Sequence, residues 1–485
     1  MSQKYFPTIG IECHVQFKTS TKLFSGSSND ARSISPNNLI NHIDLGLPGA
    51  LPVLNRSALD LAIKAGFALN ATAETFSTFD RKHYFYPDLP NGYQITQFEH
   101  PIISSGHVNF EIDQKAYRVD ITRAHIEADA GKSSHPAGSD YSLVDLNRVG
   151  TPLLEIVSEP QMHSAIEARY YAHELYLLMK YAQVTYGDLF QGNMRFDVNV
   201  SLSTEREVLG TRTETKNLNS FRSVEKAVEY EIKRQTEALD RGQKIVQCTM
   251  GWDDAKQKNF VQRIKENADD YRYMPEPDIP PIELTVTELD KVKKTMPILP
   301  NEWRGILTKI GLNPAQIEIL LENNIDYPEV GYLNILLNVD QLKSNTKQIA
   351  NWLINSDIPL LSSNDNPKNN LNRQEFYLNL LTLVEAGELN STNAKVLINK
   401  FLLGELSSIN NLKAVASNYG LIQSSDSDDL KKSVIKVLED NPKAVADIKS
   451  GENKAKGFLI GQVMKLTNNQ ANPGMVSKLI DELTK

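Results

Sequence analysis

The sequence predicts an α+β protein, with a domain built on an antiparallel sheet followed by an all-α C-terminal region. Two patterns in the first half indicate this: segments with strict two-residue alternation, and segments with helical spacing between them. From about residue 285 the alternation disappears and helical spacing continues to the end. A chain of 485 residues is long enough for two or three domains. We place them at residues 1–293, 294–409 and 410–485.

The first predicted strand, residues 9–18, carries the clearest alternation. Its apolar positions are Ile9, Ile11, Cys13, Val15 and Phe17, and its polar positions are Glu12, His14, Gln16 and Lys18. A period of two gives one dry and one wet face, with Glu12 and His14 about 7 Å apart on the wet one. Glu12 and His14 can hold a divalent ion or move protons, although a solvated face alone also explains one such strand.

The same design recurs in three further predicted strands. Acids, amides and bases alternate there with small or apolar residues: Arg123, His125, Glu127 and Asp129; Arg195, Asp197 and Asn199; and Arg212, Glu214 and Lys216, followed by Asn217. An antiparallel sheet can leave one face wet. A face this rich in both signs of charge is better explained as the floor of a site than as plain surface.

Segments between these strands carry helix signals. Residues 56–70, 162–183 and 223–239 have helical spacing, and Ser223 is the expected N-cap of the third helix. Residues 79–97 mix basic and aromatic side chains. Such a loop either stacks on a base and grips phosphate, or is pinned against the sheet by its rings.

Other segments narrow the interpretation. Ala130–Ser134 resembles the end of a phosphate-binding P-loop but lacks the glycine that such a loop needs four residues earlier, so we reject that assignment. Residues 153–157 read as a strand carrying Glu155. Charge and proline in residues 252–281 mark the end of the first domain, and residues 362–372 have the composition of a linker.

Composition limits the compartment and the partners. The formal net charge of −8 excludes a generally basic nucleic-acid coat, but not a local basic patch. Cys13 and Cys248 are the only cysteines, so a disulfide framework is implausible and a reducing cytoplasm is expected. The N-terminus has no signal-peptide core, and no apolar run is long enough to span a bilayer. We therefore expect a cytoplasmic protein without a membrane partner.

The polar face predicts phosphoryl transfer that depends on magnesium and ATP. Glu12, Glu127, Asp197 and Glu214 supply the hard oxygen ligands that Mg²⁺ prefers, and His14 and Asn199 can complete the set. Arg195, Arg212 and Lys216 can neutralise phosphate. Catalysis there would be positioning plus charge neutralisation, because no nucleophile–base pair for acyl transfer is recognisable.

Long blocks of the sequence resemble the B subunits of glutamyl-/aspartyl-tRNA amidotransferases. In the first part these are IGIECHVQFKTSTKLF, LGLPGALPVLN, FDRKHYFYPDLPNGYQITQ, DLNRVGTPLLEIVSEP, GNMRFDVNVSLS, TETKNLNSFRSVEKAVEYEIKRQ and DYRYMPEPDIPP. KAKGFLIGQVMK and QANPG are similar to the YqeY-like tail of that family. The resemblance covers nearly the whole chain.

The resemblance implies a ligase that forms a carbon–nitrogen bond. Mg·ATP would phosphorylate the carboxylate of Glu on tRNA-Gln, or of Asp on tRNA-Asn, and ammonia would then displace the phosphate. Ammonia would come through a channel from the A subunit, a glutaminase, which a small C subunit links to this one in a heterotrimer. The catalytic domain would be similar in fold to glutamine synthetase, and the helical tail, with Lys443, Lys449, Lys454, Lys456 and Lys465, would grip the tRNA. A tRNA-binding scaffold and a stand-alone Mg²⁺ phosphohydrolase are the alternatives.

Carried over by position, the implied site residues lie on the wet strands. The metal ligands would include Glu12, His14, Glu127 and Glu214, with Asp197 nearby; Lys216 would join the catalytic set, and Arg195, Asn199, Arg212 and Asn217 would bind the nucleotide. Many members carry a four-cysteine zinc knuckle after the first strand. Ser25, Ser27, Asn41 and Asp44 stand at the matching positions here, so we expect no zinc.

Overall fold

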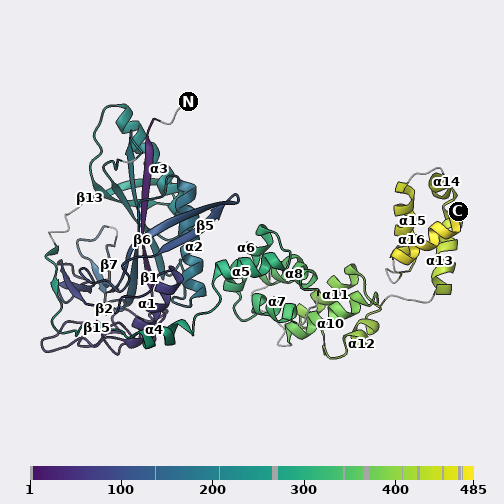
Figure 1. Ribbon diagram of the computed structural model, residues 1–485, viewed down its shortest axis with the longest axis horizontal. Helices are drawn as coiled ribbons and strands as arrows, with labels where there is room; N and C mark the ends of the chain where they lie inside the picture. Colours follow the sequence, from purple (N-terminus) through teal and green to yellow (C-terminus); the bar gives the residue numbers. More distant parts are fainter. Residues whose placement is uncertain are drawn as a thin grey trace. The chain divides into compact units, whose positions relative to one another are not determined.

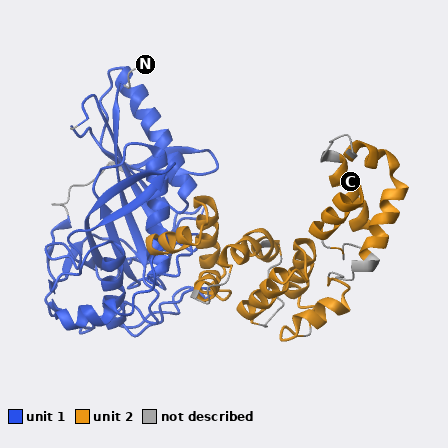
Figure 2. Ribbon diagram, turned by 45° about the vertical axis from the view of Figure 1, so that its right-hand side comes forward, with its two compact units in different colours: residues 1–300 blue, residues 301–485 orange. Residues whose placement is uncertain are grey.

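The computed structural model divides the chain into two compact units, residues 1–300 and 301–485 (Figure 2). It describes residues 4–484 except 137, 207, 265–270, 342–344, 364–371, 407, 423–426, 450–452, 468–470 and 472. Each unit is described by itself below.

An eight-stranded sheet forms the centre of the first unit (Figure 1), in the order β13-β12-β11-β10-β1-β9-β6-β5. The strands are β1 (Phe6–Gln16), β5 (His107–Ile112), β6 (Lys115–Ala128), β9 (Pro152–Ser158), β10 (Met194–Ser203), β11 (Thr213–Leu218), β12 (Cys248–Asp253) and β13 (Lys258–Ile264). The sheet is antiparallel except where β11 pairs with β12. The purely antiparallel sheet of the prediction is therefore corrected at this pair, whose connection contains helix α3 and crosses over as parallel pairing requires.

Three small sheets surround the large one. β14 (Met274–Pro275), β3 (Asp80–His83) and β4 (Tyr93–Thr96) form the first. β15 (Ile282–Glu283) pairs with β2 (Phe76–Ser77), and β7 (Lys132–Ser134) pairs with β8 (Leu143–Asp145). Through β14, the predicted domain end is tied back to the aromatic–basic segment on β3 and β4.

The dry face of the sheet packs against α1 (Arg56–Ala68), α2 (Ala165–Tyr181) and α3 (Phe221–Asp240). Alternation along β1 is as predicted: Ile9, Ile11, Cys13 and Val15 are at most 1% exposed and belong to this core. The expected N-cap of α3 was wrong, because Ser220 caps this helix and Ser223 lies in its first turn. Phe221 explains the earlier start, since its ring packs on Phe196 of the sheet.

Two strands were not foreseen. β12 and β13 form a hairpin that includes the beginning of residues 252–281, which had been assigned only by their charge and proline. The short α4 (Val286–Lys293) contacts α1 and closes the first unit.

The second unit is helical, as predicted. It contains α5 (Pro300–Lys309), α6 (Pro314–Asp326), α7 (Tyr332–Gln341), α8 (Thr346–Trp352), the π-helix η2 (Leu353–Asp357), α9 (Ile358–Ser363), α10 (Arg373–Glu385), α11 (Ser391–Leu402), α12 (Leu412–Asn418), α13 (Ser427–Asp440), α14 (Pro442–Lys449), α15 (Asn453–Leu466) and α16 (Pro473–Thr484). The last four helices pack around a core of their own that includes Val434, Leu459, Val463 and Ile480.

The predicted boundary at residue 410 falls between α11 and α12 and stays a prediction. Most of the predicted linker, residues 364–371, lies outside the described residues. None of the helices described here combines the length and apolarity that crossing a bilayer requires.

Candidate active site: two acidic clusters that share one strand

Strand β1 lies between the two halves of the polar face. On one side it pairs with β10, where Glu12 is opposite Asp197. On its other side it pairs with β9, where His14 is opposite Glu155. Glu12 and His14 point to the same face of one strand, so each gathers acids from a different neighbour.

The first cluster contains His14, His125, Glu127 and Glu155. The Nε2 atom of His14 lies 3.8 Å from Glu127 and 3.6 Å from Glu155, and the Nε2 atom of His125 lies 3.7 Å and 3.4 Å from the same two carboxylates. His14, Glu127 and Glu155 each offer a ligand atom within 4.8 Å of the other two. One histidine and two carboxylates at this spacing can hold a divalent ion.

The charges of the first cluster are mutually dependent. Burial alone would lower the pKa of His125, but Glu155 and Glu127 outweigh it and raise that pKa to about 9. Burial would raise the pKa of Glu155, yet the two histidines hold it well below its usual range. Without an ion, the histidines supply the positive charge that these acids need.

The second cluster contains Glu12, Asp197 and Glu214, which also offer ligand atoms within 4.8 Å of one another. Lys216 bridges it, with Nζ 3.0 Å from Asp197 and 3.2 Å from Glu214. Asp197 also accepts a 2.8 Å hydrogen bond from the backbone of Asn217.

Crowding of like charges marks the second cluster as a cation site. Burial raises the pKa of Glu12, and the carboxylates of Glu155, Asp197 and Glu214 raise it further. Asn199 donates to Glu12 at 3.0 Å, but its own Oδ1 is buried with no hydrogen-bond partner among the described residues, as is Nδ1 of His14. A bound cation would relieve the repulsion and could use an unpaired oxygen.

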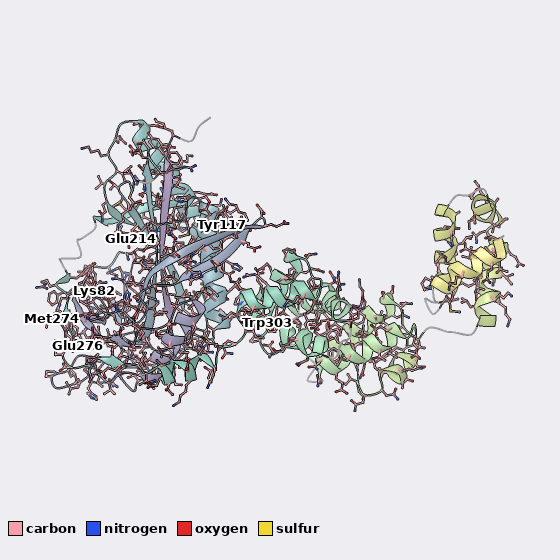
Figure 3. All side chains as sticks on the ribbon, in the orientation of Figure 1. Lys82, Tyr117, Glu214, Met274, Glu276 and Trp303 are labelled. Atoms are coloured by element: carbon pink, nitrogen blue, oxygen red, sulfur yellow. The ribbon has the colours of Figure 1, made fainter. Side chains whose placement is uncertain are left out.

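Basic groups border both clusters. Arg195 lies opposite His14 on β10, and its guanidinium is 3.3 Å from Asp129, which Arg148 also contacts at 3.2 Å. Lys82, labelled in Figure 3 with Glu214, comes from β3. Burial would lower the pKa of Lys82, but the negative charge of Glu127 and other nearby groups raises it.

The rings of the predicted aromatic–basic segments meet above Lys82. Its Nζ lies 4.8 Å from the ring centre of Tyr271, which contacts both Tyr84 and Tyr273 edge-to-face with centroids 6.2 Å apart. His83 Nδ1 lies 3.0 Å from the carbonyl oxygen of Arg272, within hydrogen-bond reach. The rings therefore pack on one another and on the lysine, which is the second of the two interpretations left open for residues 79–97.

The structure brings most of the predicted site residues together. Glu12, His14, Glu127, Asp197, Glu214, Lys216, Asn199 and Arg195 all lie in or beside the two clusters. Arg212 is exposed just before β11, and Asn217 contacts the cluster through its backbone while its exposed side chain does not. Their nucleotide-binding roles, like the other site assignments, stay predictions.

Two residues were not in the predicted site. Glu155 was recognised on its strand but not assigned to the site, although a lone acid in the apolar run Leu-Leu-Glu-Ile-Val is a usable signal. Lys82 was seen only as part of a basic loop, and nothing in its neighbours reveals which carboxylates it faces.

Comparison with known proteins gives a consistent family. Residues 7–290 match the family described as the GatB/GatE catalytic domain, and residues 336–483 match the GatB domain. The B subunit of the aspartyl/glutamyl-tRNA(Asn/Gln) amidotransferase of Trichodesmium erythraeum is 41% identical over 99% of this chain and 97% of its own length. The protein of the same name from Persephonella marina is 40% identical over 99% of this chain and its entire length. The chain belongs to the family of amidotransferase B subunits.

Proposed function

We propose that the chain is the amidating subunit of a glutamine-dependent tRNA amidotransferase. It would use Mg·ATP to phosphorylate the side-chain carboxylate of Glu on tRNA-Gln, or of Asp on tRNA-Asn, and then amidate it with ammonia from the glutaminase, the A subunit. The carrying observation is the pair of acidic clusters joined by β1. The names of the relatives support the substrate class and the assembly with the A and C subunits.

The donor chemistry of both clusters suits magnesium. Glu12, Asp197 and Glu214 offer only carboxylate oxygen, and His14, Glu127 and Glu155 offer two carboxylates and an imidazole. When bound, Mg²⁺ would neutralise phosphate charge and polarise the phosphoryl oxygens. Two such sites on one rigid sheet fit the transfer of a phosphoryl group between two anions.

The residues of the chain then have separable tasks. Lys216 holds Asp197 and Glu214 at a fixed distance, and Asn199 orients Glu12. Lys82 is a buried ammonium that can accompany the γ-phosphate, and Arg195 can accompany a second anion. These groups position the reactants and balance their charge, which is the main need of phosphoryl transfer.

The two steps balance without a nucleophile from this chain. A carboxylate oxygen of the aminoacyl group attacks the γ-phosphorus, the bond to the β-phosphate breaks, and ADP leaves with the electron pair. Ammonia next attacks the acyl carbon, the bond to the phosphate oxygen breaks, and inorganic phosphate leaves as the nitrogen loses a proton. Glutamine synthetase runs the same pair of steps, and we propose a comparable sheet design for it and for this unit.

The helical tail would hold the tRNA. In α14 and α15, Lys443 and Lys465 are exposed and Lys456 is paired with Asp481 at 2.7 Å. The side chains of Lys449 and Lys454 lie outside the described residues. Exposed lysines near a phosphate backbone give salt-dependent binding.

The test uses the purified complex with Mg·ATP, glutamine and each misacylated tRNA. Glu12→Ala or Glu214→Ala should abolish ATP-dependent amidation and leave glutamine hydrolysis by the glutaminase largely intact. Glu111→Ala, at an exposed position on β5, is the matched control and should keep both activities. Retained amidation in the two site variants would contradict the proposal. ATP turnover by the isolated chain without tRNA would favour a phosphohydrolase instead.

A further inference from the structure

A charged pair is buried in the loop between β1 and α1. The Lys22 side chain is 0% exposed and the Asp44 side chain 2%, with Nζ 3.4 Å from the carboxylate. Lys22 also donates a 2.6 Å hydrogen bond to the carbonyl of Leu39. Lysine is almost never fully buried unless it is paired, so this ammonium has a specific role in the loop.

Asp44 is the centre of a small polar network. Its carboxylate accepts hydrogen bonds from the Ser25 hydroxyl at 2.7 Å, the Ser27 hydroxyl at 2.6 Å and the Asn41 backbone N–H at 3.0 Å. Together with Lys22, these donors come from both ends of the loop and close it upon itself. A carboxylate with this many donors is fully satisfied although it is buried.

These are the four positions at which the family resemblance implies a zinc knuckle, and their chemistry does not suit that metal. Structural zinc is bound by thiolates and imidazoles, whereas Ser25, Ser27, Asn41 and Asp44 offer two hydroxyls, one amide and one carboxylate. The Asp44 oxygens already bind donors, and the Lys22 ammonium supplies a positive charge beside them.

The loop is fastened to the segment that carries Arg148. Leu23 donates to the carbonyl of Gly150 at 2.8 Å, and Asn147 accepts 2.8 Å hydrogen bonds from the backbones of Asn38 and Leu39. Gly150 has φ +79°, and a Cβ there would meet Asp44 Oδ1 at 3.2 Å. Loop and segment therefore approach each other closely on both sides of Arg148.

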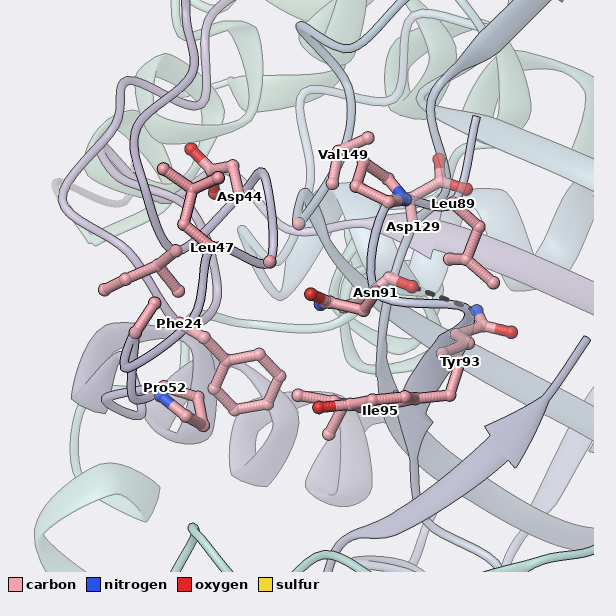
Figure 4. A pocket seen from close by; sticks show the side chains of 17 residues that line it. Phe24, Asp44, Leu47, Pro52, Leu89, Asn91, Tyr93, Ile95, Asp129 and Val149 are labelled. Atoms are coloured by element: carbon pink, nitrogen blue, oxygen red, sulfur yellow. Dashed lines mark hydrogen bonds between the residues drawn. The ribbon is translucent and has the colours of Figure 1, made fainter. Parts of the chain in front are cut away.

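Arg148 transmits this position to the active site. It pairs with Asp129, which pairs with Arg195 at the edge of the first cluster. The loop and Asp129 also line one cavity of about 240 Å³, with Asp44, Leu47 and Pro52 among the loop residues that line it (Figure 4). A loop that moved would change the shape of this cavity and the support of Arg195.

We infer that the buried Lys22–Asp44 pair fixes this loop without a metal ion and thereby positions Arg148, Asp129 and Arg195. Lys22 and Asp44 are positioning residues, since they contact neither cluster. The first half of the inference is independent of the proposed function, and the second half rests on it through the role of Arg195.

The first experiment follows trypsin cleavage after Arg32, in the exposed stretch 31–38 of the loop, in the full-length chain. Lys22→Met keeps the length of the side chain but leaves a buried carboxylate without its cation, so cleavage should accelerate at least about tenfold. Lys18→Met, a half-buried lysine four residues earlier, is the matched control and should leave the rate unchanged. An unchanged rate in Lys22→Met would overturn the inference.

A double variant separates loss of the pair from general damage. Lys22→Met with Asp44→Asn removes both charges, so it should recover most of the protection that the single variant loses. No recovery would mean that the pair does not fix the loop. Treatment of the parent chain with a zinc chelator should not change cleavage, and faster cleavage after chelation would overturn the metal-free assignment.

A kinetic measurement tests the positioning step. In the assembled enzyme, Lys22→Met should raise the KM for ATP or for the aminoacyl-tRNA about threefold to tenfold, with a smaller change in kcat. Faster cleavage with unchanged KM values would keep the loop assignment and refute the link to Arg195. If the parent enzyme did not use ATP at all, the proposed function would fail while the cleavage result would stand.

Discussion

Glu231 provides the sharpest test of how the second cluster is held. It lies on α3, is 0% exposed, and sits behind β11, the strand that carries Glu214. Its carboxylate accepts hydrogen bonds from the Thr213 hydroxyl at 2.6 Å and the Gln235 amide at 2.9 Å, and Arg234 contacts it through two further bonds. We expect Glu231→Leu to weaken β11 at the residue next to Glu214.

The magnitude follows from which partners can find water. The Arg234 side chain is 37% exposed and can be resolvated, so its ion pair contributes little. Thr213 and Gln235 are buried, and leaving each donor unsatisfied costs about 1–3 kcal/mol. The leucine regains part of this loss through apolar burial, so the net destabilisation of the first unit should be about 2–4 kcal/mol.

Hydrogen exchange of the β11 amides in the full-length chain measures this change locally, which avoids assuming one transition for two units. Glu229→Leu on the same helix is the control, since Glu229 is exposed and pairs only with Lys226 at the surface, and it should change stability by less than about 0.5 kcal/mol. Equal protection of β11 in the two variants would refute the reasoning. A loss confined to α3 would show that the network does not support the strand.

Two further outcomes can be measured. Glu155→Gln should reduce Mg²⁺-dependent amidation at least about 100-fold, because it removes a charged oxygen from the first cluster; activity assays against Glu111→Gln check this, and activity near that of the control would exclude Glu155 as a ligand. Removing the chain after residue 410 should weaken tRNA binding and flatten the dependence of log K on log salt, while Mg²⁺ binding by the first unit is retained. Unchanged affinity would refute the role of the tail.

The sequence was sufficient to predict the faces of the strands but not their neighbours. Alternation along β1 revealed that Glu12 and His14 point away from the core, because a dry face imposes a period of two. Nothing in that period shows that β9 lies on one side and β10 on the other, so one floor was predicted where the structure has two clusters.

Other differences have local causes. Glu155 joins the site only through the register that sets it opposite His14, and register is a property of two strands together. Ser220 and Ser223 both suit an N-cap, and the choice depends on where Phe221 packs. The parallel pairing of β12 depends on the crossover through α3, which no residue pattern in β12 itself records.

One feature of β1 limits how the enzyme can be regulated. Because Glu12 and His14 are separated by a single residue of extended chain, the spacing of the two centres is fixed by covalent geometry, with no hinge between them. A domain movement can open or cover the pair but cannot draw its members apart. Control must therefore act on delivery, through what reaches the sheet and when, since the distance between the two centres has only one setting.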